Sequence, residues 1–229
     1  MEWNVSESDF RTVIRWTLGL LAACGLAVFW LVLQTPLRPQ IQALASELLA
    51  LDSQQALWYV TRAAGLTAYF LLWLSAAWGL AVSTRILDSG LPRAFTFDAH
   101  EFLSLLALGF TAVHVGALAF DRYLPFSLGQ LLVPFLGTYR PVWVGLGVIG
   151  MYVAILVSAT FYLRRRIGAG TFRTIHYLSY ASYALVTLHA WFAGTDTPLA
   201  ATRGLYLAGF LVILFLSIFR VTQALEARA

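Results

Sequence analysis

Two apolar stretches, HEFLSLLALGFTAVH at residues 100–114 and HYLSYASYALVTLH at residues 176–189, each begin and end with a histidine. They contain all 4 histidines of the 229-residue chain. His100 and His114 lie 14 residues apart, and His176 and His189 lie 13 apart. A histidine inside a membrane is energetically costly and marks a functional site by default. The matched pairs therefore predict two membrane helices that share two sets of ligands.

The composition excludes an ordinary soluble domain. Hydrophobic residues make up 60% of the chain, charged residues make up 11%, and the mean hydropathy is +0.76. Stretches of about 20 apolar residues cross a hydrocarbon core of roughly 30 Å as helix, because lipid forces the backbone to bond internally. The sequence predicts an all-α bundle of six transmembrane helices, at approximately 14–33, 57–82, 101–120, 141–163, 174–193 and 203–221.

The charge pattern predicts the topology. All 15 basic residues are arginines, and the formal net charge is +4. With both termini in the cytoplasm, ten arginines fall on the inner side and five on the outer side, a positive-inside bias. The densest cluster, Arg164–Arg166, then lies in a cytoplasmic loop. No basic face lies free of lipid, so nucleic-acid binding is excluded.

Three further segments carry predictions of their own. The single cysteine, Cys24, excludes an intramolecular disulfide, and its apolar surroundings predict a retained first span, with lipidation as the alternative. Residues 34–56 predict a short amphipathic helix on the outer surface. The outer loop 121–140 is unusually apolar and predicts a lid, which either roofs an outer cofactor or only covers helix ends.

The histidines predict haem. The third and fifth spans run parallel, so His100 should meet His176 near the cytoplasmic side and His114 should meet His189 near the outer side. The two levels are then about 20–21 Å apart along the helices. Neutral imidazoles on both faces of an iron are a standard way to hold haem. Zinc or copper would favour ligands clustered within one or two helical turns, and a proton relay would favour carboxylates mid-span.

The two spacings differ in helical phase. On an ideal α-helix, two side chains 14 positions apart differ by roughly 40° in direction around the helix axis. Two side chains 13 positions apart differ by roughly 140°. Either the fifth helix is locally distorted, for instance by a π-bulge, or the two haems lie at different azimuths.

The chain resembles the ferric-reductase-like transmembrane domain, the six-helix haem module of ferric reductases and NADPH oxidases, and is most similar to its small bacterial members. The resemblance covers roughly residues 57–197, and the paired histidine spacing is its most specific part. The matching segments are WYVTRAAGL, HEFLSLLALGFTAVH, LLVPFLGTYRPVWVGLGVIGMY and HYLSYASYALVTLHAWFAGTD.

This resemblance implies two stacked b-type haems, an inner one on His100 and His176 and an outer one on His114 and His189. Arg62 matches a family arginine near the outer haem propionates, with interfacial snorkelling as its alternative role. From topology, Arg140 is a second outer candidate. Arg93 and Arg173 are inner candidates on the same ground.

The sequence departs from the full-length family members because no GxGxxG dinucleotide fingerprint occurs. The GLGVIG run at 145–150 lies within a predicted span and is interpreted as helix-packing glycine. Residues 1–229 are therefore expected to form a single haem domain without a site for FAD or NAD(P)H.

The expected function is electron transfer across the plasma or inner membrane of a bacterium. The donor would be a separate flavoprotein or quinol, and the acceptor ferric iron, oxygen or a partner reductase outside. Haem subunits of bacterial methionine sulfoxide reductase systems are similar in this respect. Whether the chain is itself an enzyme, as a haem-containing oxidoreductase subunit, stays open. The alternatives are a haem-binding sensor or assembly subunit and a transporter, although the chain lacks the intramembrane carboxylates that a transporter would favour.

Overall fold

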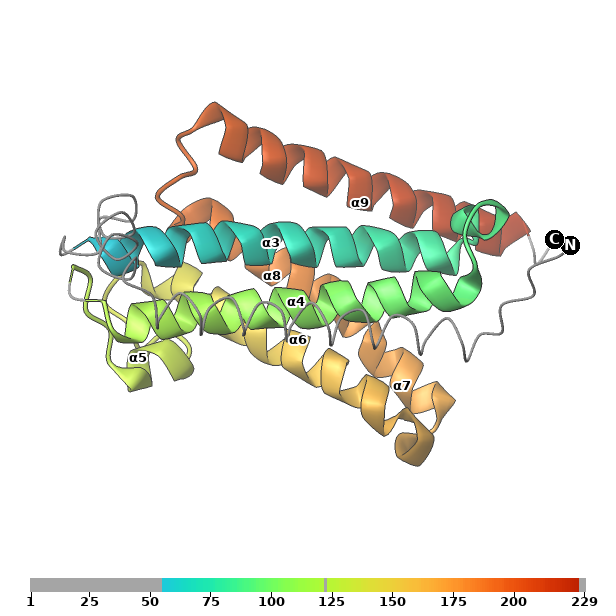
Figure 1. The fold of residues 1–229 in the computed structure, drawn as a ribbon, viewed down its shortest axis with the longest axis horizontal. Coiled ribbons are helices and arrows are strands. Elements are labelled where there is room, and N and C mark those ends of the chain that lie inside the picture. Colours follow the sequence, from blue (N-terminus) through green and yellow to red (C-terminus); the bar gives the residue numbers. More distant parts are fainter. Residues whose placement is uncertain (1–54, 122, 227–229) are drawn as a thin grey trace, which may run out of the picture. The chain divides into compact units, whose positions relative to one another are not determined.

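Every regular element in the described part of the chain is helical. The computed structural model describes residues 55–121 and 123–226 (Figure 1). Its elements are α3 (Ala56–Ser83), the 3₁₀ helix η1 (Ile86–Ser89), α4 (Arg93–Ala119), α5 (Leu128–Leu132), α6 (Pro141–Ile167), α7 (Ala169–His176), α8 (Leu178–Ala193) and α9 (Ala200–Glu226). The predicted span 14–33, Cys24 and nearly all of the predicted helix at 34–56 lie outside the described residues.

Four helices are long and apolar enough to cross a membrane. Helices α3, α4, α6 and α9 have 27 or 28 residues each, with mean hydropathies from 1.5 to 2.2. At about 1.5 Å per residue, each exceeds the roughly 30 Å of a hydrocarbon core. They confirm long apolar helices, able to cross a membrane, at the predicted spans 57–82, 101–120, 141–163 and 203–221. Helix α4 begins earlier than predicted, at Arg93, directly after Pro92.

The predicted fifth span, 174–193, differs because it is not one continuous helix. Helix α7 ends at His176 and α8 begins at Leu178, with Tyr177 in a turn between them. The Tyr180 N–H donates to the Tyr177 carbonyl at 3.2 Å, which is a three-residue turn. Tyr177 itself keeps right-handed helical dihedral angles, so the interruption is a single turn residue between two helices, and the structure has no π-helix in the described part of this span.

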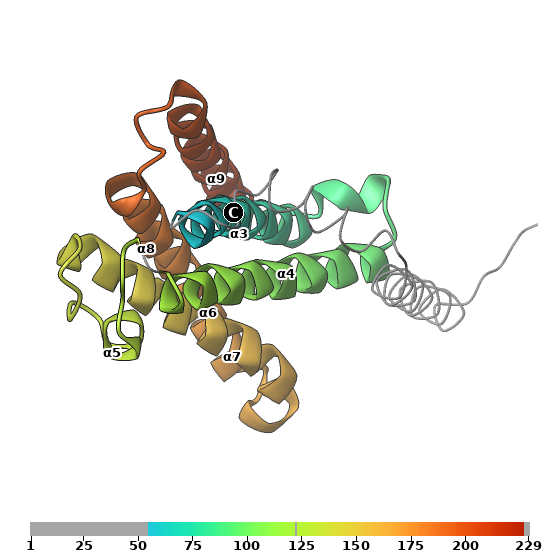
Figure 2. The ribbon, with the colours of Figure 1, turned by 60° about the vertical axis from the view of Figure 1, so that its left-hand side comes forward.

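The helices are joined by polar contacts that bridge apolar faces. Helix α6 packs most extensively against α8, and the two lie side by side in both views (Figures 1 and 2). Trp78 Nε1 on α3 donates to the Thr96 carbonyl on α4 at 2.9 Å. Trp73 Nε1, also on α3, donates to the Gly209 carbonyl on α9 at 3.1 Å. Helix α3 is therefore held between α4 and α9.

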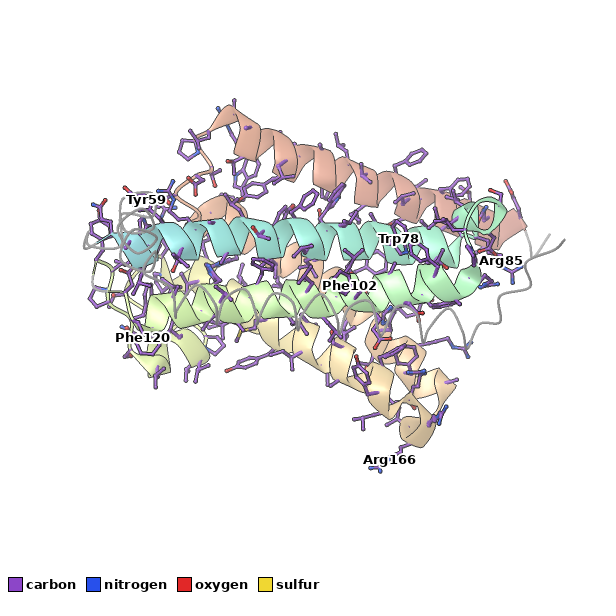
Figure 3. The ribbon with its side chains drawn as sticks, in the orientation of Figure 1. Tyr59, Trp78, Arg85, Phe102, Phe120 and Arg166 are labelled. Atoms are coloured by element: carbon purple, nitrogen blue, oxygen red, sulfur yellow. The ribbon has the colours of Figure 1, made fainter. Side chains whose placement is uncertain are left out.

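The outward faces of the helices are apolar, as a lipid-facing surface requires. On α9, Leu211 and Phe215 are 60% and 67% exposed, and on α4 Phe102 is 53% exposed (Figure 3). Tyr59 and Phe120 lie at one end of the helices and Arg85 and Arg166 at the other (Figure 3). Apolar side chains without cover in water would form an aggregating surface, so these faces indicate contact with a lipid bilayer.

Candidate cofactor-binding site

The structure brings the four histidines together as two pairs. The rings of His100 on α4 and His176 on α7 have centroids 6.1 Å apart and planes at 78°. Those of His114 on α4 and His189 on α8 have centroids 6.3 Å apart and planes at 80°. These are the two pairs expected from parallel third and fifth spans. Their role as metal ligands stays a prediction.

The separation within each pair matches that of two imidazoles on one metal ion. A metal–imidazole bond is about 2.0–2.1 Å long and a ring centre lies about 1.2 Å further on, so opposed ligand rings have centroids about 6.4 Å apart. Both ring planes contain the ligand axis in that arrangement, and any angle between them is allowed. Edge-to-face packing of two aromatic rings covers the same distance range. The assignment therefore depends on what holds each ring.

Three of the four imidazoles are held by a main-chain carbonyl on a neighbouring helix. The distances from Nδ1 to oxygen are 3.1 Å from His100 to Ser75, 2.8 Å from His114 to Thr61, and 3.0 Å from His189 to Trp143. A carbonyl oxygen only accepts, so Nδ1 carries the proton in each ring. Nε2 of a neutral imidazole is then unprotonated, the state of a metal ligand whose other nitrogen is fixed by a second contact.

The same three rings lie against glycines. A Cβ placed on Gly65 would be 2.8 Å from the ring of His114, and one on Gly79 would be 2.9 Å from that of His100. A Cβ on Gly147 would be 2.5 Å from His189. Only glycine allows this close approach between backbone and imidazole. Gly147 belongs to the GLGVIG run, whose packing role is confirmed, although the sequence did not show that its neighbour is a histidine.

His176 is held differently. Its Nδ1 atom is buried and, within residues 55–121 and 123–226, has no hydrogen-bond partner. Its ring lies against Phe172, with centroids 5.3 Å apart, instead of against a glycine. It is also the last residue of α7, directly before the turn at Tyr177. One ligand candidate of the four therefore lacks the support that the other three share.

All four histidines line one cavity of about 400 Å³. Ligand pockets in proteins are typically about 300–1,000 Å³. Most of the lining is apolar and comes from α3, α4, α6 and α8. The hydroxyl of Thr61, buried in the lining, has no hydrogen-bond partner in the described part of the chain. An unpaired buried hydroxyl favours a ligand with polar groups beside it.

The donor set fits a haem better than a bare metal ion. Among the described residues, no group of three or more His, Cys, Asp or Glu side chains is placed to hold a metal. Each histidine pair supplies two nitrogens, whereas zinc sites use three or four protein ligands. A porphyrin supplies the four remaining nitrogens itself, so two histidines complete the coordination. The residues present therefore fit a bis-histidine haem at each level.

An ion pair lies at the end of the cavity nearest His114 and His189. Arg62 on α3 binds Asp196 with two nitrogens, Nε to Oδ2 at 2.9 Å and Nη2 to Oδ1. Both residues line the cavity, and the Asp196 side chain is only 10% exposed. Sequence analysis selected Arg62 but missed Asp196, which occurs in the AGTD segment. Opposite charges at the ends of two distant apolar spans are the sole signal in the sequence, and they do not identify which residues pair.

Arg140 lies elsewhere. It lines a shallow second pocket with Arg203 and Trp191, and its guanidinium donates to the Phe192 carbonyl. It is absent from the described lining of the histidine cavity. Arg62, but not Arg140, is therefore among the described residues that line the histidine cavity, and the role of either arginine beside an outer haem stays a prediction.

At the opposite end of the cavity, two arginines line the wall. Arg173 was selected from the sequence, whereas Arg220 was considered only as a topology charge. Arg220 Nη2 donates to the Tyr177 hydroxyl at 3.3 Å. Arg93 instead pairs with Asp88 at 3.7 Å and is not among the described lining residues.

The apolar outer loop contributes to the cavity wall. Its short helix α5 begins with a capping box between Ser127 and Gln130, and Leu131 on this helix is only 4% exposed. The cavity-lining residues of the loop are Leu124, Phe126, Leu131 and Tyr139. This arrangement favours the alternative in which the loop roofs one end of the cavity over the one in which it covers helix ends alone.

Three tyrosines were missed entirely by sequence analysis. Tyr69, Tyr183 and Tyr206 come from α3, α8 and α9, are at most 5% exposed and line the cavity. The hydroxyls of Tyr69 and Tyr183 are 3.4 Å apart. A tyrosine in an apolar span carries no signal of its own in the sequence, because the aromatic belt gives the same composition.

Comparison with known proteins adds nothing to this geometry. No protein-family model, no curated protein and no solved structure matches the chain. The function is therefore argued from the residues of the cavity.

Proposed function

We propose that this protein binds two b-type haems, one at each histidine pair, and carries electrons across the membrane between them. The observation that carries the proposal is the pair of imidazole separations, 6.1 and 6.3 Å, with three of the four rings held through Nδ1. When bound, each haem supplies an iron centre that is reduced and oxidised by one electron.

The protein's first task is to orient the ligands. The carbonyls of Thr61, Ser75 and Trp143 fix the ring rotation and keep Nε2 available. A hydrogen bond at Nδ1 also makes the imidazole a more basic ligand, which stabilises the oxidised iron relative to the reduced iron. The glycine contacts leave room for the rings between closely spaced helices.

Its second task is to provide cations at both ends of an apolar cavity. A haem carries two propionates, and guanidinium groups bind carboxylates with parallel hydrogen bonds. Arg62 uses two of its five N–H donors on Asp196. This ion pair holds the guanidinium at the cavity, where its other donors can bind a propionate. Arg173 and Arg220 are the corresponding residues at the other end.

Its third task is to span the bilayer. His100 and His114 are separated by about 21 Å along α4, which puts one site in each half of a hydrocarbon core of roughly 30 Å. The arginine-rich end, with Arg164–Arg166, is proposed as cytoplasmic by the positive-inside rule. The pair His100 and His176 is then the inner site. The apolar helices around both sites exclude water.

The electron donor and acceptor are proposed by chemical class. The proposed inner donor is a separate flavoprotein or a membrane quinol. The outer acceptor is chelated ferric iron, oxygen or a partner reductase. The roof formed by Leu124, Phe126 and Leu131 favours transfer through the protein edge over entry of a bulky acceptor. The proposed location is the plasma or inner membrane of a bacterium.

The first test is the haem content of the purified, detergent-solubilised full chain, with a reduced-minus-oxidised spectrum. The proposal expects two low-spin b-type haems per chain. The double variants His100→Ala/His176→Ala and His114→Ala/His189→Ala should each retain one. A wild-type chain that binds no haem when expressed with excess haem would overturn the proposal.

The second test measures electron transfer across a bilayer. The haem-loaded protein is placed in lipid vesicles with ferricyanide trapped inside, and an impermeant reductant is added outside. The expected result is loss of the internal ferricyanide absorbance, with little loss in vesicles that contain either double variant. Equal rates for the wild type and both double variants would contradict electron transfer through the two sites.

A sensor or assembly subunit is the second candidate, and the separate environment of His176 favours it. A ligand without the support of the other three is expected to dissociate more readily. The same vesicle assay separates the two functions, because a sensor would bind haem without sustained reduction of ferricyanide.

A further inference from the structure

The four histidines do not have equal support, and the difference falls within one pair. His100, His114 and His189 each have a carbonyl acceptor for Nδ1 and a glycine against the ring. His176 has neither among the described residues, and its ring lies against Phe172. The pair His114 and His189 is therefore supported on both sides, whereas the pair of His100 and His176 is supported on one.

The backbone around His176 is also less well supported than the backbone around the other three histidines. His100, His114 and His189 lie within α4 and α8 with at least four helical residues on each side. His176 is the last residue of the eight-residue helix α7. Helix ends open more readily than helix interiors, because fewer backbone hydrogen bonds hold them.

The described contacts of the His176 ring are with side chains and not with a main-chain carbonyl. Tyr177, directly after it, is 56% exposed and accepts a hydrogen bond from Arg220 at 3.3 Å. Phe172 offers an apolar face that a ring can leave without breaking a hydrogen bond. The outer pair, in contrast, lies beneath the roof that contains Phe126 and Leu131.

From these observations we infer that His176 is an exchangeable ligand and that the inner site binds a small neutral two-electron donor, of the class of carbon monoxide. The inference rests on the proposed haem sites. With carbon monoxide, the bond between His176 Nε2 and the iron would break and a bond from the carbon atom to the iron would form. Imidazole and carbon monoxide are both neutral two-electron donors, so the iron would keep its oxidation state. His114 and His189 keep the outer site closed.

The test is the number of carbon monoxide molecules bound by the reduced, haem-loaded full chain. Haem content is measured on the same sample, so a failure of the haem proposal is seen as missing haem and not as missing carbon monoxide. The expected result is two haems per chain and one carbon monoxide per chain. Two haems with no carbon monoxide, or with two, would overturn the inference while leaving the haem proposal intact.

The matched double variants locate the site. The chain with His114→Ala/His189→Ala retains only the inner haem, which should bind one carbon monoxide. The chain with His100→Ala/His176→Ala retains only the outer haem, which should bind none. The reverse result would overturn the inference. If either variant does not fold, the wild-type stoichiometry alone still decides.

The single variant His176→Ala gives an independent readout. Because no histidine then competes, carbon monoxide should bind at least about tenfold faster, while haem content stays near that of the wild type because His100 remains. Added imidazole should restore the six-coordinate spectrum. An unchanged rate would show that His176 is not the ligand displaced.

Discussion

Helix α4 and the α7–α8 pair perform the same task with different backbones. Helix α4 is continuous and carries His100 and His114 with a spacing that returns to nearly the same face. The α7–α8 pair has one residue fewer between its histidines, and the turn residue Tyr177 directly follows the first of them. Both pairs of rings nevertheless line one cavity. Two different histidine spacings, on one continuous and one interrupted helix, therefore bring their rings to the same cavity.

The break also has an energetic consequence. On α4 both rings are supported by α3, through carbonyls and glycines that face them. On α7–α8 only His189 is supported in this way, by α6. In this comparison, the histidines within continuous helices have a carbonyl and a glycine against the ring, and the histidine at a helix end has neither among the described residues. The following predictions test that link.

The largest effect is expected from Gly147→Ala. The added Cβ would lie 2.5 Å from Nδ1 of His189, so the ring must leave the position in which it donates to Trp143. Haem binding at the outer level should weaken by up to about 100-fold, the upper range for loss of a contact that orients a ligand. Haem titration of the purified protein measures this. Gly170→Ala on α7 is the matched control, because nothing lies within 4 Å of its added Cβ.

A smaller effect is expected from Gly65→Ala and Gly79→Ala on α3. The added Cβ atoms would lie 2.8 Å from His114 and 2.9 Å from His100. Each should weaken haem binding at its own level by about tenfold. Gly109→Ala on α4, with open space around it, serves as the control. Equal affinities for all three variants would show that α3 does not support the rings of α4.

Asp196→Asn should lower the free energy of unfolding by weakening the ion pair with Arg62. The change leaves the Arg62 guanidinium with a neutral partner, which should cost about 1–3 kcal/mol in the free energy of unfolding. Thermal unfolding in detergent measures it. Asp88→Asn is the control, because the pair of Asp88 with Arg93 is longer, at 3.7 Å, and more exposed. Its removal should cost no more than about 1 kcal/mol. Equal losses for both would contradict a structural role of Asp196.

The smallest effect is expected from Ser75→Ala. The hydroxyl of Ser75 lies 2.7 Å from that of Ser104 and 3.3 Å from Nδ1 of His100, but the main-chain tether remains after the substitution. Haem content should not change, and the free energy of unfolding should fall by about 1 kcal/mol. Thr67→Ala, which removes an exposed hydroxyl from the same helix, is the control. Loss of the inner haem would show that the side chain, not the carbonyl, holds His100.

The membrane helices and the histidine pairs could be predicted because both depend on patterns along the chain. Apolar length predicts a span, and the order of parallel spans predicts which histidines meet. The turn at Tyr177 could be predicted only as one of two solutions to the 13-residue spacing. The partner of Arg62 could not be predicted, because Asp196 lies 134 positions away and depends on how α3 and α8 are placed. The glycine contacts were missed because a glycine in a span fits general helix packing equally well.

The carbonyl acceptors have a consequence for how this site can change over time. Since Thr61, Ser75 and Trp143 hold the imidazoles through main-chain oxygen, the acceptor persists whatever side chain stands at those positions. Substitutions at residues 61, 75 and 143 therefore leave the acceptor in place as long as the helix keeps its register. An insertion or deletion in α3 or α6, in contrast, would move the acceptor while leaving every histidine in place. The contacts that hold the imidazoles are therefore more sensitive to insertions and deletions in these helices than to substitutions at the three acceptor positions.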